Sequence, residues 1–200
     1  GYKDFCEPGA LSARGTMFEV DSDGKPLRLA CLPMDKFFNY KENPFTENLS
    51  FENPQMIMSK EDGSLISTFI NEQGHLDFKT KSTPYSDYAY RFKYSGYYQK
   101  LSSVAFQVVE SLTRRDHTVN FEFCEEDYRI VLKHPQSRAV LLNIRSNVTG
   151  EYVEFEKLSE MERKALRPYS VPQHIIGGSV KHWVENDVSK LEGVEGFVIR

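Results

Sequence analysis

Long hydrophobic runs are absent from this chain of 200 residues. Its longest apolar stretches have about half a dozen residues, whereas a helix needs roughly 20 to cross a bilayer. No charged segment followed by an apolar run opens the sequence, so we expect neither an export signal nor a membrane anchor.

Cysteine is also scarce, and positive charge is not in excess. The three cysteines, Cys6, Cys31 and Cys124, form no CxxC pair, and the five histidines show no metal-ligand spacing. We therefore expect free thiols in a reducing cytoplasm. A net charge of −4 excludes a surface coated with cations, but a local basic groove is enough to bind nucleic acid.

Repeats, low-complexity tracts and linkers are missing as well, which predicts one continuous domain over residues 1–200. Short strand-like runs dominate, and three helices are expected among them. Strands are expected at 15–20, 26–32, 55–59, 65–70, 75–79, 118–124, 128–132, 139–145 and 194–200, and helices at 97–115, 157–166 and 179–191. Because these elements do not alternate as βαβ units, the pattern predicts an α+β fold built on antiparallel sheets.

The predicted helix at 97–115 has a clear apolar face. Leu101, Ala105, Val108 and Leu112 recur at spacings of four, three and four, which places them on one side. Upstream, six tyrosines crowd residues 85–98, and two interpretations stay open for them. They could stack RNA bases, or they could belong to an aromatic-rich helix that packs on the sheet.

The most informative segment is Met56–Ile70, MIMSKEDGSLISTFI. An apolar strand leads to Lys60, an Asp62-Gly63 turn follows, and a second apolar strand leaves. Taken alone, this is an ordinary hairpin with a solvated lysine. The chemical alternative is a nucleophile: a lysine attacks a nucleotide phosphate only as a free amine, and it needs cations for the leaving pyrophosphate and carboxylates for metal and ribose.

KEDGS at Lys60–Ser64 matches the first motif of the covalent nucleotidyltransferases, the superfamily of ligases and capping enzymes. More specifically, the chain resembles the type 1 RNA ligases of T-even bacteriophages, which are ATP-dependent and repair tRNA. The resemblance runs almost end to end. Its blocks are ALSARGTMFEV (10–20), LPMDKFFNYKENPFT (32–46), KEDGSLISTF (60–69), FKTK (78–81), NFEF (120–123), LLNIR (141–145), TGEY (149–152), LRPY (166–169) and VEGFV (194–198).

The resemblance implies a role for each matching position. Lys60 would attack ATP and hold AMP as a phosphoramidate, with Asp62 and Gly63 completing the catalytic motif and Lys81 acting as an essential lysine downstream. The implied nucleotide-binding residues are Arg14 at the phosphates, Lys36 at the triphosphate end with Phe38 in the same block, Glu122 at the ribose, and the pair Glu195-Gly196, whose acid would also bind the metal. ATP and Mg²⁺ are the implied cofactors. Taken singly, Arg14, Lys36 and Lys81 are more typical of solvated surface charges, and Glu122 of an outward-facing strand residue.

The implied function is RNA sealing by an adenylyltransferase domain. Its partners would be RNA ends with a 5′-phosphate and a 3′-hydroxyl, with broken tRNA as the implied RNA. The protein would act as a monomer in the cytoplasm of an infected bacterium. The family's aromatic N-terminal segment, its fifth Lys-x-Lys motif and its helical C-terminal domain find no match, so the sequence reads as a fragment of a longer ligase. Two alternatives stay open: a DNA ligase or capping guanylyltransferase, and a non-catalytic nucleotide- or RNA-binding module.

Overall fold

The computed structural model describes residues 2–7, 9–128 and 130–200. Its centre is a four-stranded antiparallel sheet in the order β5-β4-β6-β7. The strands are β4 (Ser64–Ile70), β5 (Leu76–Thr80), β6 (His117–Cys124) and β7 (Arg138–Ser146). Two smaller antiparallel pairs flank it: β1 (Met17–Val20) with β2 (Pro26–Cys31), and β3 (Ile57–Ser59) with β8 (Phe197–Ile199). The predicted α+β fold with antiparallel sheets is confirmed.

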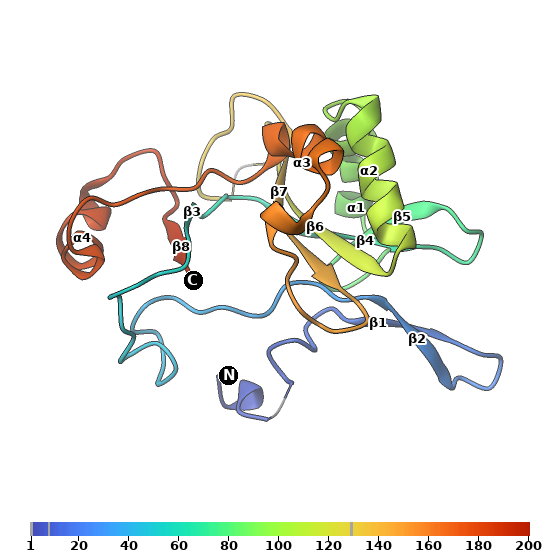
Figure 1. The fold of residues 1–200 in the computed structure, drawn as a ribbon, viewed down its shortest axis with the longest axis horizontal. Helices are drawn as coiled ribbons and strands as arrows, with labels where there is room; N and C mark the ends of the chain where they lie inside the picture. Colours follow the sequence, from blue (N-terminus) through green and yellow to red (C-terminus); the bar gives the residue numbers. More distant parts are fainter. Residues whose placement is uncertain (1, 8, 129) are drawn as a thin grey trace.

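Helices cover one face of the central sheet (Figure 1). They are α1 (Asp87–Arg91), which continues into the π-helical turn η2 (Phe92–Tyr97), and the longer α2 (Ser103–Arg114) and α3 (Glu160–Leu166). All four residues of the predicted apolar face, Leu101, Ala105, Val108 and Leu112, are buried in the main core. The helix itself starts later than predicted, because Ser102 caps it by accepting a hydrogen bond from the Ala105 backbone N–H.

A second group of elements surrounds the pair β3–β8. Here α4 (Val180–Asn186) ends before the predicted Leu191, and the 3-10 turn η5 (Val188–Lys190) follows. Trp183 of α4 packs edge-on against Phe197 of β8, with ring centroids 4.7 Å apart. The remaining 3-10 turns are η1 (Tyr2–Phe5), η3 (Phe155–Lys157) and η4 (Arg167–Tyr169).

The prediction of a strand at 128–132 is wrong for the residues of that range that the structure describes. These residues lie in the loop between β6 and β7, which pair directly with each other. The backbone N–H groups of Val131 and Leu132 donate to the carboxylate of Asp62 instead of to a neighbouring strand. An apolar run therefore serves here as a loop that closes over a buried acid.

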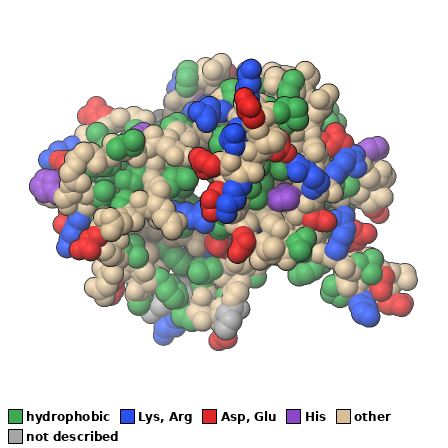
Figure 2. Space-filling model, viewed as in Figure 1, with side chains coloured by type: hydrophobic (Ala, Val, Ile, Leu, Met, Phe, Trp, Pro, Cys, Tyr) green, Lys and Arg blue, Asp and Glu red, His purple; other side chains and the backbone are tan. Residues whose placement is uncertain are grey.

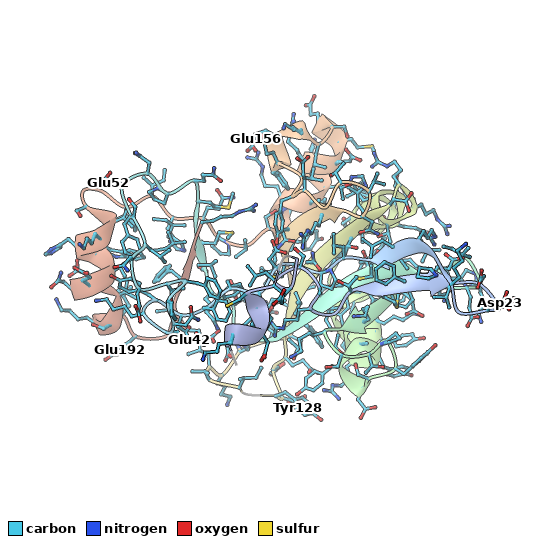
Figure 3. The ribbon with its side chains drawn as sticks, turned by 90° about the horizontal axis from the view of Figure 1, so that it is seen from below. Asp23, Glu42, Glu52, Tyr128, Glu156 and Glu192 are labelled. Carbon is cyan, nitrogen blue, oxygen red and sulfur yellow. The ribbon has the colours of Figure 1, made fainter. Side chains whose placement is uncertain are left out.

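The distribution of charged side chains on the surface agrees with the modest net charge of −4. Figure 2 shows basic and acidic side chains mixed over the face that it presents. The β1–β2 hairpin projects from the body, with Asp23 at its tip (Figure 3). Within the described residues, no helix is both long enough and apolar enough to cross a membrane.

Candidate active site

Lys60 lies directly after β3, where the small sheet joins the central one. The pairing of β3 with β8 brings this lysine to Glu195 and Gly196, 135 residues further along the chain. The Lys60 backbone N–H donates to the Gly196 carbonyl over 2.9 Å, and the Lys60 ammonium forms an ion pair with Glu195. Because the Lys60 side chain is 31% exposed and that of Glu195 18% exposed, the pair is half-buried and still reachable from solvent.

Glu122 is the second acid at this lysine. It lies on β6 opposite Leu65 of β4, and its neighbours Phe121 and Phe123 point into the core. Alternation along the strand therefore directs Glu122 to the other face of the sheet. The pKa of Glu122 is raised to about 8, mainly by burial and with a smaller contribution from the nearby Glu195 carboxylate, against the opposing effects of the Lys60 charge and a hydrogen bond from the Gly63 backbone. At neutral pH Glu122 is thus mainly protonated.

Gly63 is required by a close approach between backbones. A Cβ atom at this position would lie 2.3 Å from the carbonyl oxygen of Phe123, so any side chain would push the turn away from β6. The contact that the structure shows for this glycine is with the neighbouring strand. The close approach is what seats the turn beside Glu122.

Asp62 faces away from Lys60. It is buried, and its carboxylate accepts hydrogen bonds from the backbone N–H groups of Val131, over 2.7 Å, and Leu132. Nε2 of the buried His134 donates to its carbonyl oxygen over 2.7 Å. Asp62 therefore ties the turn after Lys60 to the β6–β7 loop. No local pattern indicated a role for His134, because its partner is a backbone atom 72 residues away.

Lys36 and Phe38 lie in an extended segment against the N-terminal part of the chain. The Lys36 backbone N–H donates to the Leu11 carbonyl over 3.0 Å, and its ammonium lies 5.0 Å from the centre of the Phe38 ring. That ring also contacts Phe5 and Phe45, at 5.6 and 5.9 Å between centroids. The structure shows no direct contact of Lys36 with Lys60.

Arg14 and Lys81 come together through their backbones. A Cβ atom on Gly15 would lie 2.8 Å from the Lys81 carbonyl oxygen, so the segment that carries Arg14 presses on the end of β5. Arg14 is half-buried and Lys81 exposed, and neither makes an ion pair with any described residue. Both cations are therefore free for an anionic ligand, but neither contacts Lys60.

Lys79 is a residue that the sequence analysis missed. It is buried, and its ammonium donates to the carbonyl oxygens of Gly15 and Thr80, over 2.7 and 2.8 Å. Burial lowers the pKa of this lysine, against an opposing effect of Cys31. Lys79 thus fixes the Arg14 segment to β5. Its position near the end of β5, two residues before Lys81, was the only available signal.

Arg145, in the LLNIR block, performs a similar task. Its buried guanidinium donates to Asp35 over 2.7 Å, to the Ser12 hydroxyl over 2.9 Å and to two backbone carbonyls, those of Pro33 and Gly150. The Ser12 hydroxyl donates in turn to Asp35. Arg145 therefore joins the segments that carry Arg14 and Lys36 to the central sheet.

The acids at Lys60 include one oxygen that fits a cation. Oε2 of Glu195 is buried and has no hydrogen-bond partner among the described residues. Across all the residues that the structure describes, no group of three or more His, Cys, Asp or Glu side chains could hold a metal by itself. This donor set suits Mg²⁺, which is commonly held by one or two carboxylates together with substrate phosphates.

Comparison with solved structures identifies the fold. An archaeal ATP-dependent RNA ligase, known in two forms, superimposes with TM-scores of 0.58 and 0.53 at 13% and 15% identity. The matches cover 93% and 94% of this chain, and 48% and 56% of the archaeal chains. A ligand-free variant of the Naegleria gruberi RNA ligase gives a TM-score of 0.51 at 14% identity, covering 92% of this chain and 57% of that one. The protein therefore has a mixed α+β fold of the adenylyltransferase type.

Sequence comparison then gives the family. A family model described as RNA ligase matches residues 12–200, and the chain belongs to this RNA ligase family. An RNA ligase homologue from Thermovibrio ammonificans is 25% identical over 199 residues, which are 98% of this chain and 48% of that protein. The chain thus spans about half the length of these relatives.

Proposed function

We propose that the protein is an ATP-dependent RNA ligase whose nucleophile is Lys60. The observation that carries this proposal is the meeting of Lys60, Glu195 and Glu122, which come from three separate parts of the chain. A half-buried amine beside two acids, at a site still open to solvent, suits covalent nucleotidyl transfer. Membership of the RNA ligase family favours RNA over the DNA ligase and capping alternatives.

The first chemical step follows from these contacts. Lys60 passes one proton from Nζ to Glu195, its ion-pair partner, and the neutral amine attacks the α-phosphorus of ATP. A P–N bond forms, the bond from the α-phosphorus to the bridging oxygen breaks, and pyrophosphate leaves with that oxygen and takes up the second proton that the nitrogen loses. In this proposal Glu122, protonated at neutral pH, donates a hydrogen bond to a ribose hydroxyl. Mg²⁺ at Glu195 would supply charge neutralisation for the phosphates.

The cations complete the nucleotide site in this proposal. Arg14, Lys36 and Lys81 bind the phosphates of ATP. Two features support this: among the described residues neither Arg14 nor Lys81 is engaged in an ion pair, and Lys79 and Arg145 hold the segments that carry these cations in place. Phe38 and Gly196 shape the same site.

Two further steps would complete the reaction. The AMP passes from Lys60 to an RNA 5′-phosphate, and an RNA 3′-hydroxyl then displaces AMP to form a phosphodiester. The resemblance to the T-even phage enzymes points to broken tRNA as the substrate and to a monomer in the bacterial cytoplasm. A comparison of ligation rates on a cleaved tRNA anticodon loop and on an unstructured RNA of equal length tests the substrate.

The central test is an intact-mass measurement after incubation with ATP and Mg²⁺. We expect a mass gain of one AMP in the wild type and none in Lys60→Ala. Lys60→Arg is the matched variant, because arginine keeps the ion pair with Glu195 but is not a nucleophile at neutral pH. An adduct in either variant would refute the assignment. GTP in place of ATP tests the capping alternative, and reversible ATP binding without a mass gain would favour a non-catalytic module.

A further inference from the structure

The helical segment α1–η2 has one face that is fixed to the core. Phe92 and Tyr97 are buried there, and the ring of Phe92 lies 5.4 Å from that of Phe123. Gly96 is needed on this face, because a Cβ atom would lie 2.7 Å from the Phe123 ring. The hydroxyl of Tyr97 donates to the carbonyl of Phe106 over 3.3 Å. These contacts set the orientation of the whole segment.

The opposite face of the segment carries a row of exposed tyrosines. Tyr90, Tyr94 and Tyr98 are spaced four residues apart and are 67%, 46% and 48% exposed. Their ring centroids lie 4.7 Å apart for the first pair and 6.1 Å for the second. The rings are tilted by 50° and 44° to each other, so they do not cover one another as a parallel stack would. Ring faces in this row are therefore open to a ligand.

The charge around the row leaves one unpaired cation for an anionic partner. Residues 85–100 contain three cations, Arg91, Lys93 and Lys100, and one anion, Asp87, in a chain whose net charge is −4. Arg91 is already paired with Glu125, over 2.7 Å. Lys93 lies 6.0 Å from the Tyr94 ring centre and also contacts Asp77. Lys100 is exposed and makes no ion pair within the part of the chain that the structure describes.

From this arrangement we propose that Tyr90, Tyr94 and Tyr98 form a stacking platform for single-stranded RNA. Bases stack on the tyrosine rings and the exposed Lys100 contacts a phosphate, a combination that gives sequence-tolerant single-strand binding. Of the two interpretations that the sequence left open, packing on the sheet holds for Tyr97, whereas the three exposed tyrosines are where RNA stacking is to be tested. The platform rests on the proposed RNA ligase function, for which it supplies a place to hold an RNA end.

The test is the affinity for a fluorescently labelled single-stranded RNA, measured by anisotropy at fixed salt. We expect the double variant Tyr90→Ala/Tyr94→Ala to bind roughly tenfold or more weakly than the wild type, because each base–aromatic stack contributes about 1–3 kcal/mol. Both positions are exposed and helical, where alanine is favourable, so the fold should persist. The double variant Tyr90→Phe/Tyr94→Phe keeps the rings and should bind nearly as the wild type does.

Tyr85→Ala is the matched control, because Tyr85 is 90% exposed and lies before the helix, outside the row. It should leave the affinity unchanged. Unchanged binding by the double alanine variant, or an equal loss in the double phenylalanine variant, would overturn the platform. So would an equal loss on duplex RNA, whose bases are not free to stack. If the alanine variant binds RNA normally but loses self-association in sedimentation, the row is a protein contact and the RNA assignment is wrong.

The same proteins separate this proposal from the ligase function. Formation of the AMP adduct needs no RNA, so the double alanine variant should gain AMP as the wild type does. Lys60→Ala should lose the adduct and keep its RNA affinity. A normal adduct together with unchanged RNA binding would remove the platform alone, and a missing adduct in the wild type would remove the ligase function alone.

Discussion

Replacing Glu122 by glutamine should flatten the dependence of stability on pH. The pKa of Glu122 rises from the ordinary 4.5 to about 8 in the folded protein. Between these values the folded protein holds a proton that the unfolded chain has released. The stability linked to this proton is therefore present in full below about pH 4.5, falls as the pH rises and is lost above about pH 8.

The size of the effect follows from the pKa values. One pKa unit corresponds to about 1.4 kcal/mol, so the rise to about 8 sets an upper limit of about 5 kcal/mol. Solvent that reaches the half-buried side chain lowers this figure, and we expect about 2–4 kcal/mol between pH 5 and pH 8. Glutamine has the shape of the protonated acid and cannot ionise. Glu122→Gln should thus match the wild type at pH 5 and exceed its stability at pH 8.

The assay is urea unfolding of both proteins at several pH values, with stability taken as the free energy of unfolding. The other ionisable groups contribute to both proteins, so their effects largely cancel in the difference. Glu126→Gln, at an exposed position just after β6, is the control and should show no pH-dependent difference. A constant difference between Glu122→Gln and the wild type from pH 5 to pH 8 would refute the reasoning.

Three further substitutions test how the site is held together. Gly63→Ala should destabilise the fold by about 2–4 kcal/mol in urea unfolding and reduce formation of the AMP adduct, because its Cβ would meet the β6 backbone, whereas Gly177→Ala, in open space, should do neither. Asp62→Asn should cost about 1–3 kcal/mol and speed proteolysis of the β6–β7 loop, since the charged acceptor for two backbone N–H groups is lost. Arg145→Met should cost about 3–5 kcal/mol by leaving Asp35 without its buried partner, and unchanged urea stability would contradict that role.

The sequence predicted most elements because their signals are local. The apolar face of α2 and the two strands of the β4–β5 hairpin depend on neighbouring residues, and both were predicted. The loop at 128–132 was not, because its apolar composition resembles a strand and only the distant Asp62 decides its conformation. Likewise, a helix at α1 and η2 stayed one of two open interpretations, since their four tyrosines face both the core and solvent and give no clean helical period.

The candidate site divides in the same way. The resemblance to the RNA ligases predicted Lys60, Glu122 and Glu195 as site residues, and the structure brings these three together, although their chemical roles stay predictions. It did not predict Lys79 or Arg145 as anchors, because each acts through a backbone carbonyl or a side chain more than 60 residues away. Such anchors have no motif, since the residue type alone does not distinguish a buried cation from a solvated one.

The arrangement of these parts suggests why the motif turn is built so tightly. Gly63 presses the turn on β6 and Asp62 holds it to the β6–β7 loop, so the backbone on the C-terminal side of Lys60 is fixed. On the N-terminal side, β3 is fixed by β8, which also delivers Glu195. The backbone around Lys60 is thus a rigid frame for its side chain. The nucleophilic attack that we propose exchanges an ion pair for a bond to phosphorus, and it needs such a frame, because the frame keeps the attacking nitrogen close to its target while the side chain changes partner.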